Sequence, residues 1–363
     1  MNNKISKIQL GMILSMLMCS MQLGLGDTIL LNISKNNVLI AITIGIIIGL
    51  IPIIIYIKIN ESLIDKNIYQ KNTILFGNKL GFIINLFVFL IFFIMLMISV
   101  RSLVLFMNSK YLQDTPYLFL GLLVILTVNV ISFCSSEGIA RILRIGFIIT
   151  FIAMIIIEIF LLRYIDINNI LPIIITPNNV NQITNGALYF ACQTSLLSFL
   201  LLTISRTKIK NKNINKIIIL SYLFGTICLL VTMFFVVSCF GYDMATLFRY
   251  PEYIILKKIT LSSTDLHLEN LLAFRWNIYI ISLAIIANYG LLCGIKTYSK
   301  NRKINKYIIL IVSLLAVIIS KYLINDVTTS IIFMKNNYVK LIALPIFIIY
   351  LIIYLKIKKV AKK

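Results

Sequence analysis

Four charged residues lie within or at the border of long apolar stretches, and they are the side chains best placed to do chemistry: Asp27, Arg101, Glu158 and Arg275. Charge inside hydrocarbon is costly, so such residues usually serve binding or ion passage. At about 1.5 Å rise per residue, Arg101 and Glu158 fall in the outer half of their stretches. They either pair inside the protein or extend to the outer surface. Arg275, one turn into its stretch, is expected to extend outward.

Enzyme chemistry is not indicated by the remaining residue types. His267 is the only histidine, and the chain has no G-x-S-x-G or H-E-x-x-H motif, so a hydrolytic triad or a zinc site is not predicted. We interpret His267 as a solvated loop residue. The six cysteines have no C-x-x-C spacing and are expected to pack as small apolar residues. No P-loop is present, and we expect no cofactor.

Two apolar stretches are interrupted by polar or small residues. The first changes character between Cys19 and Asp27, where Gly24 and Gly26 follow Ser20 and Gln22; the sixth contains Gln193, Thr194 and Ser195 just after Tyr189. Unwound backbone at membrane depth is tolerated only where it lines protein or a cavity. Interruptions in corresponding spans of two halves predict an inverted-repeat transporter fold with its ligand at the broken helices. The alternative is that these residues only let helices pack closely.

The elements that position these residues are ten apolar stretches, each near the length of about 17–25 residues that a membrane helix needs. They fill nearly the whole chain, which is 60% hydrophobic. We name them span one to span ten: 8–31, 38–57, 80–107, 117–134, 145–162, 186–205, 217–240, 271–294, 307–324 and 339–355. The sequence therefore predicts an all-α membrane protein with a single domain over 1–363, a first repeat at about 8–162 and a second at about 186–355.

Positive charge alternates in the loops between these spans. The N-terminus, the even-numbered loops and the C-terminus hold 23 Lys and Arg residues, whereas the opposite side holds nine. Basic residues near span ends stay in the cytoplasm, so both termini are predicted to be cytoplasmic. The net charge of +22 is spread over short turns, where anionic lipid is the natural neighbour. A nucleic-acid surface would need these residues gathered on one folded face, so no nucleic-acid partner is expected.

Several short strings, in order over roughly residues 4–300, resemble the spore germination permease family, the B subunit of nutrient germinant receptors. Each string also has a structural interpretation, such as a helix start at Thr115-Pro116 or a surface pair between Glu137 and Arg141. The strings are Lys4-Ile5-Ser6 with Gln9-Leu10, Arg101 with Phe106, Leu112 to Pro116 including Thr115, Glu137 to Arg141, Tyr250-Pro251, Leu266 to Glu269, and Trp276.

The resemblance implies more than the residues do. The family is similar to amino-acid/polyamine/organocation transporters, which implies a five-plus-five inverted repeat with broken helices 1 and 6, and a location in the inner spore membrane. It implies a small nutrient germinant, an amino acid above all, and A and C receptor subunits as partners. An amino-acid permease of the same superfamily is the alternative. The chain departs from the family at Ser20, where glycine is frequent, and in span six, which lacks the expected proline and glutamate.

These considerations predict a ligand cavity between spans one, three, six and eight. Unwound backbone from Ser20 to Gly24 would offer N–H donors to a carboxylate, beside the positive end of a half-helix that begins near Asp27. Polar residues of span six would complete the lining and neighbouring apolar side chains would exclude water. The predicted ligand-binding residues are Ser20, Gln22, Gly24, Tyr189, Gln193, Thr194 and Ser195. Those assigned to family motifs or structure are Arg101, Thr115, Pro116, Glu137, Arg141, Tyr250, Pro251 and Glu269.

Overall fold

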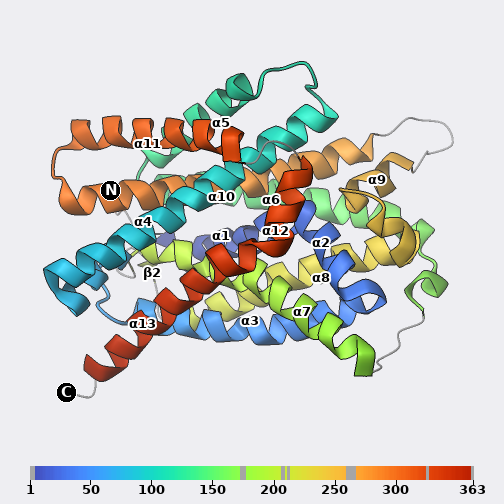
Figure 1. Cartoon of the computed structure of the whole chain (residues 1–363), viewed down its shortest axis with the longest axis horizontal. Helices are drawn as coiled ribbons and strands as arrows, with labels where there is room; N and C mark the ends of the chain where they lie inside the picture. The colour runs from blue at the N-terminus through green and yellow to red at the C-terminus, as the bar shows by residue number, and fades with distance from the viewer. Residues whose placement is uncertain are drawn as a thin grey trace.

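The computed structural model describes residues 5–171, 177–205, 209–210, 213–258, 267–323 and 327–360, and these residues are almost entirely helical (Figure 1). One two-residue parallel ladder joins β1 to β2. The elements are β1 (Ile5–Ser6), α1 (Lys7–Gln22), α2 (Leu25–Ser34), α3 (Val38–Glu61), α4 (Ile68–Lys110), α5 (Tyr117–Ser132), α6 (Ser136–Leu161), α7 (Pro177–Thr194), η4 (Ser195–Thr203), β2 (Ile209–Lys210), α8 (Ile214–Thr246), α9 (Pro251–Lys258), α10 (Leu268–Tyr298), α11 (Arg302–Leu323), α12 (Val327–Asn336) and α13 (Leu344–Val360). Short 3-10 turns cover Lys35–Asn37, Leu162–Tyr164 and Ile167–Ile170, and a π turn, Val339–Ala343, leads into α13.

Each predicted span falls on one of these helices or on a consecutive pair. Eight helical segments of the described chain are long and apolar enough to cross a membrane, and Tyr117–Ser132 is a shorter apolar helix. Span one is divided into α1 and α2, whereas span six continues from α7 into the 3-10 helix η4. The protein is therefore an integral membrane protein built from helices. Two further helices, α9 and α12, lie in segments that the sequence suggested were loops.

Glycine residues with positive φ set where two long helices bend. Gly77 (φ +78) separates the first turns of α4 from its apolar part, and Gly241 (φ +71) does the same near the end of α8. Glycine adopts this conformation without the steric penalty that a side chain brings. Span three was predicted to begin at Leu80, which agrees with a change of direction at Gly77.

Span one lies at the centre of the bundle. Every residue from Ile13 to Leu31 is buried, and α1 packs against α6, α7, α8 and α10. The outer helices expose large apolar side chains instead, among them Val130, Ile145 and Ile311. A helix that is apolar all round suits either a core or a lipid-facing position. Span one is thus shielded from lipid, so its polar groups can be paired with other protein groups instead of facing hydrocarbon.

The helices pair in a regular way. Helix α3 of the first predicted repeat packs on α7 of the second, and α8 of the second packs on α1 of the first; α4 packs on α10, and α5 packs on α11. Span one comprises α1 and α2, and span six comprises α7 and η4. When each span number is shifted by five, the contact of spans two and six becomes that of spans seven and one. The contacts of spans three and eight and of spans four and nine are unchanged by the same shift. Random packing of ten helices gives no reason for such a match.

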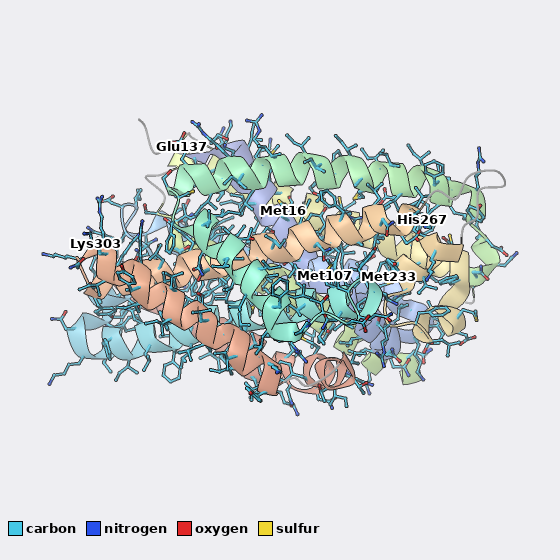
Figure 2. All side chains as sticks on the ribbon, turned by 90° about the horizontal axis from the view of Figure 1, so that it is seen from above. Met16, Met107, Glu137, Met233, His267 and Lys303 are labelled. Carbon is cyan, nitrogen blue, oxygen red and sulfur yellow. The ribbon has the colours of Figure 1, made fainter. Side chains whose placement is uncertain are left out.

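Both chain ends lie at the same end of the bundle, and α9 lies at the other (Figure 1). Figure 2 places Glu137 and Lys303 at one end and His267 at the opposite one. The parallel pairing of Ile5 with Ile209 ties the N-terminus to the segment after span six. The loops predicted to be cytoplasmic therefore share one end.

Reporter fusions test which end faces the cytoplasm. We expect a fusion after Lys303 to report a cytoplasmic location and a fusion after Asp265 to report an external one, because basic loops resist translocation. A fusion after Lys212 should match the one after Lys303; Lys212 and Asp265 lie outside the described residues. An external signal after Lys303 would contradict the predicted orientation.

Candidate ligand site at the break in span one

The break in span one that the sequence predicted is present, but it is short. The helix α1 continues through Gln22, and α2 begins at Leu25, so only Leu23 and Gly24 lie between them. The prediction that backbone from Ser20 to Gly24 is unwound is therefore wrong, since Ser20 and Gln22 belong to the last turn of α1. Gly24 has φ +82 and ψ −117, a conformation that side-chain-bearing residues adopt only at a cost.

Two side chains from other elements bind the backbone of this break. The Gly24 N–H donates to Glu252 Oε1 on α9 over 2.7 Å, and Trp276 Nε1 on α10 donates to the Leu23 carbonyl over 2.8 Å. The Thr28 hydroxyl donates to the Arg249 carbonyl over 2.7 Å. Peptide groups that leave a helix need partners when they are buried. Here α9 and α10 supply them.

The predicted carboxylate-binding donor is thus occupied by a carboxylate of the protein itself. Glu252 is 5% exposed and was not among the predicted site residues. The available signal was its position directly after Tyr250-Pro251, between Arg249 and the Lys257-Lys258 pair. A buried acid in such a loop needs a donor, and sequence alone does not reveal that Gly24, 228 residues away, supplies it.

An aromatic cluster surrounds the break. The ring of Phe106 lies 4.5 Å from that of Trp276 and 5.3 Å from that of Tyr250, centroid to centroid, in edge-to-face arrangements. Tyr253 approaches Phe106 to 5.9 Å. Such pairs contribute about 0.5–1.5 kcal/mol each beyond the area they bury. Three residues of the motif strings, far apart in sequence, therefore meet at one place and fix α9 over α4 and α10.

A cavity lies on one side of the break; we call it the Arg101 cavity. It is narrow, with room for only one or two water molecules. The guanidinium of Arg101 lies 4.4 Å above the ring of Tyr117, and its side chain is 3% exposed, so Arg101 does not extend to the surface. The lining residues are Ser20, Met21, Leu23, Leu25, Ile98, Arg101, Ser102, Trp276, Ile280, Phe333 and Met334.

This lining matches the predicted cavity in part. Spans one, three and eight contribute, but α12 closes the cavity where span six was expected. Span six does not unwind in the described chain: α7 passes directly into η4 at Ser195. The prediction of a broken helix 6 is therefore corrected to a change of helix type.

The other predicted ligand residues are buried but do not converge on this cavity. Gln22 Nε2 donates to Asp27 Oδ1 over 3.0 Å, and Gln193 Nε2 donates to the Tyr189 hydroxyl over 2.9 Å. The hydroxyls of Thr194 and Ser195 donate to carbonyls one turn earlier in their own helix. Of the predicted set, Ser20 lines the Arg101 cavity, Gly24 binds Glu252, and Ser195 lines a separate apolar groove.

A second cavity also borders α10; we call it the Arg275 cavity. It holds about 280 Å³ of space between atoms and is lined by Arg275, Glu158, Glu252 and Thr232 together with apolar side chains. The expectation that Arg275 extends to the surface is wrong: it is 1% exposed, and its Nη2 donates to Thr232 Oγ1 over 3.2 Å. Glu158 therefore faces Arg275, and Arg101 lines the other cavity.

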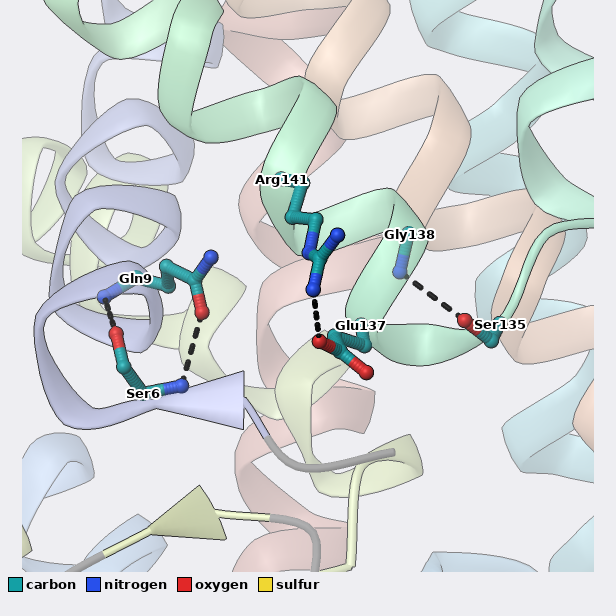
Figure 3. Close-up of polar contacts among 6 residues, drawn as sticks. All are labelled: Ser6, Gln9, Ser135, Glu137, Gly138 and Arg141. Atoms are coloured by element: carbon teal, nitrogen blue, oxygen red, sulfur yellow. Dashed lines mark hydrogen bonds and ion pairs between the residues drawn. The ribbon is translucent and has the colours of Figure 1, made fainter. Parts of the chain in front are cut away.

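The remaining motif residues have structural contacts. Ser6 and Gln9 form a reciprocal capping box at the start of α1, and Ser135 caps α6 by accepting from the Gly138 N–H (Figure 3). Lys4, the first residue of that motif, lies outside the described residues. Arg141 Nη2 donates to Glu137 Oε1 over 2.6 Å on the surface, as the four-residue spacing predicted (Figure 3).

At the other end of the bundle, helix starts and one surface contact account for the motifs. Thr115 and Pro116 precede α5, and Pro251 begins α9. The side chain of His267 is 68% exposed and lies 3.0 Å from Glu269 Oε1, so it is a solvated residue with one acidic neighbour.

Comparison with known proteins agrees with the strings in the sequence. A family model described as spore germination protein matches residues 4–326. That range covers nine of the ten predicted spans, all the residues that line the Arg275 cavity, and those that line the Arg101 cavity except Phe333 and Met334. No curated protein matches the chain. The resemblance drawn from the motifs is thereby confirmed.

Proposed function

The chain belongs to the spore germination protein family, and from that premise we propose that this germination-related membrane permease is the nutrient-binding B subunit of a germinant receptor in the inner spore membrane. It recognises a small nutrient, an amino acid in the first place, and passes a conformational change to A and C subunits. A ligand achieves this only by binding one conformation more tightly than another.

The observation that carries the proposal is a buried arginine beside a helix break. Arg101 brings a permanent positive charge into the Arg101 cavity, together with the Ser20 and Ser102 hydroxyls and the Trp276 ring. A guanidinium binds a carboxylate through two parallel charge-assisted hydrogen bonds. A free amino acid supplies that carboxylate. We therefore place the nutrient carboxylate on Arg101 and its small side chain against Ile98 and Ile280.

The narrowness of the cavity supports a closed resting form. Because it has room for only one or two water molecules, nutrient entry requires α12 or Trp276 to move. Phe333 and Met334 on α12 form one wall, and α12 packs on α2, so movement there reaches the break directly. The nutrient then selects an opened form.

The pairing of helices supports the five-plus-five inverted repeat. The contacts α3–α7 and α8–α1 exchange under a shift of five spans, and α4–α10 and α5–α11 map onto themselves. In folds of this kind the ligand lies at the interface of the repeats, near helices interrupted at membrane depth. The break at Leu23–Gly24 supports that position for the site, with repeats at about 8–162 and 186–355.

An inverted repeat is also typical of secondary transporters, so an amino-acid permease is the second candidate. Deleting the gene separates the two. We expect germination in response to one class of nutrient to slow, while vegetative growth on the same nutrient is unchanged, because a receptor acts in dormant spores and an uptake system feeds growing cells. Growth that fails on one amino acid with normal germination would favour the permease.

A further inference from the structure

The charges around the Arg275 cavity and the break do not balance. Asp27 on α2 and Glu252 on α9 are buried carboxyl groups, Glu158 on α6 is a half-buried one, and Arg275 on α10 brings one buried guanidinium. These groups act on one another electrostatically: Glu252 acts on Asp27, and Arg275 acts on all three acids. Burying unpaired charge costs far more than burying neutral groups. At least one of the three carboxylates is therefore stabilised by binding a proton.

Three polar atoms along the Arg275 cavity lack a hydrogen-bond partner within the part of the chain that the structure describes. They are Glu158 Oε1, Glu252 Oε2 and Arg275 Nε. Glu252 thus has two different oxygens: Oε1 binds the Gly24 N–H, while Oε2 borders the cavity. The space between atoms there is smaller than in the Arg101 cavity, and its gaps admit a single water molecule at most. A nutrient does not fit, whereas a proton does.

The surroundings of Glu252 act on its protonation in opposite directions. Burial raises the pKa of Glu252 to about 7, although the Gly24 N–H and the Arg275 charge both favour the ionised form. The ionised and neutral forms are therefore both accessible near neutral pH. The charged or titratable groups around Glu252 and the cavity are Asp27 on α2, Arg275 and Tyr279 on α10, Glu158 on α6, Cys19 on α1, Cys228 on α8, and Arg249 and Tyr250 just before α9.

We propose that Glu252 is a proton-binding latch: ionised, it occupies the Gly24 N–H and holds α9 over the break, and on binding a proton from the Arg275 cavity it releases that donor. A hydrogen bond to a carboxylate is roughly twice as strong as one to a neutral acid. We expect protonation to shift the closed-to-open equilibrium by roughly tenfold. The latch rests on the proposed function, because the break that it holds borders the Arg101 cavity, where the nutrient would bind.

The chain contains its own reporter for this latch. Trp276 is the only tryptophan; its indole N–H binds the Leu23 carbonyl, and its ring touches Gly24. Intrinsic fluorescence of the purified protein in lipid nanodiscs therefore reports on the break without any nutrient. We expect the emission maximum to titrate between about pH 5 and 9 with a midpoint near the Glu252 pKa.

Glu252→Gln keeps an oxygen acceptor but is permanently neutral, so its emission should match the low-pH form of the unchanged protein at every pH. Glu137→Gln, at the opposite end of the bundle, should titrate like the unchanged protein. His267→Asn should also titrate, which excludes the exposed imidazole as the source. Size-exclusion profiles check that each variant is folded.

Two outcomes would overturn the latch: a flat emission profile in the unchanged protein, or a Glu252→Gln profile that still titrates. Both outcomes are measured by fluorescence of the purified protein and not by germination. They can therefore be observed even if the proposed nutrient site is wrong. Conversely, a working latch in a protein that responds to no amino acid would count against the proposed function alone.

Discussion

Replacing Arg101 with glutamine should raise the nutrient concentration needed for half-maximal germination by roughly tenfold to a hundredfold, because a hydrogen bond to a charged group contributes about 1.5–3 kcal/mol and about 1.4 kcal/mol corresponds to a factor of ten. The measurement is a dose-response curve of germination in spores that carry Arg101→Gln. Glutamine keeps most of the side-chain length. The substitution therefore removes the charge and the paired N–H donors but little of the side-chain volume.

Matched variants separate binding from packing. Arg101→Lys keeps the charge but loses the planar fork, so its curve should lie between the other two. Arg163→Gln removes a cation from the 3-10 turn after α6 and should leave the curve unchanged. Because Arg101 also lies over Tyr117, protein abundance in the spore membrane must be measured for each variant. Normal abundance of Arg101→Gln with an unshifted curve would place the nutrient elsewhere.

Much of the fold follows from local chemistry and was predictable for that reason. Continuous apolar runs of membrane length give the spans, and paired glycines with polar neighbours give the break in span one. The sequence also marks Thr115-Pro116 as a helix start. In each case the residues that cause the feature lie within a few positions of it. The exact boundaries differ, as at Ser20, which stays helical because intrahelical hydrogen bonds persist to the edge of the break.

The site was predictable only in part because its contacts are long-range. Glu252 and Trp276 reach the break from 228 and 253 residues away, and nothing in their local sequence indicates a partner. Arg275 was expected at the surface from its depth in span eight, yet α9 covers that end of α10 and keeps it buried. In span six, the polar residues satisfy their own helix, so polarity there did not produce an unwound segment.

Replacing Gly24 with alanine should lower the amount of folded protein in the membrane more than any other small substitution at the break. Two costs act together. The positive φ of Gly24 is strained for any side chain, at about 1–3 kcal/mol. An added Cβ would also lie 2.9 Å from Trp276 Cζ2, and overpacking of this kind costs about 1–3 kcal/mol. The summed cost, roughly 2–6 kcal/mol, compares with total stabilities of about 5–15 kcal/mol.

Gly77→Ala isolates the first of these costs. Gly77 has a similar φ of +78, but its added Cβ would meet nothing within 4 Å among the described residues, so only backbone strain applies. The difference in thermal stability between Gly24→Ala and Gly77→Ala therefore measures the contact with Trp276. Adding Trp276→Leu to Gly24→Ala should restore part of that difference, because the smaller side chain makes room, although the bond to the Leu23 carbonyl is lost. Equal losses for the two alanine variants, with no rescue by Trp276→Leu, would mean that the Trp276 ring does not press against the break.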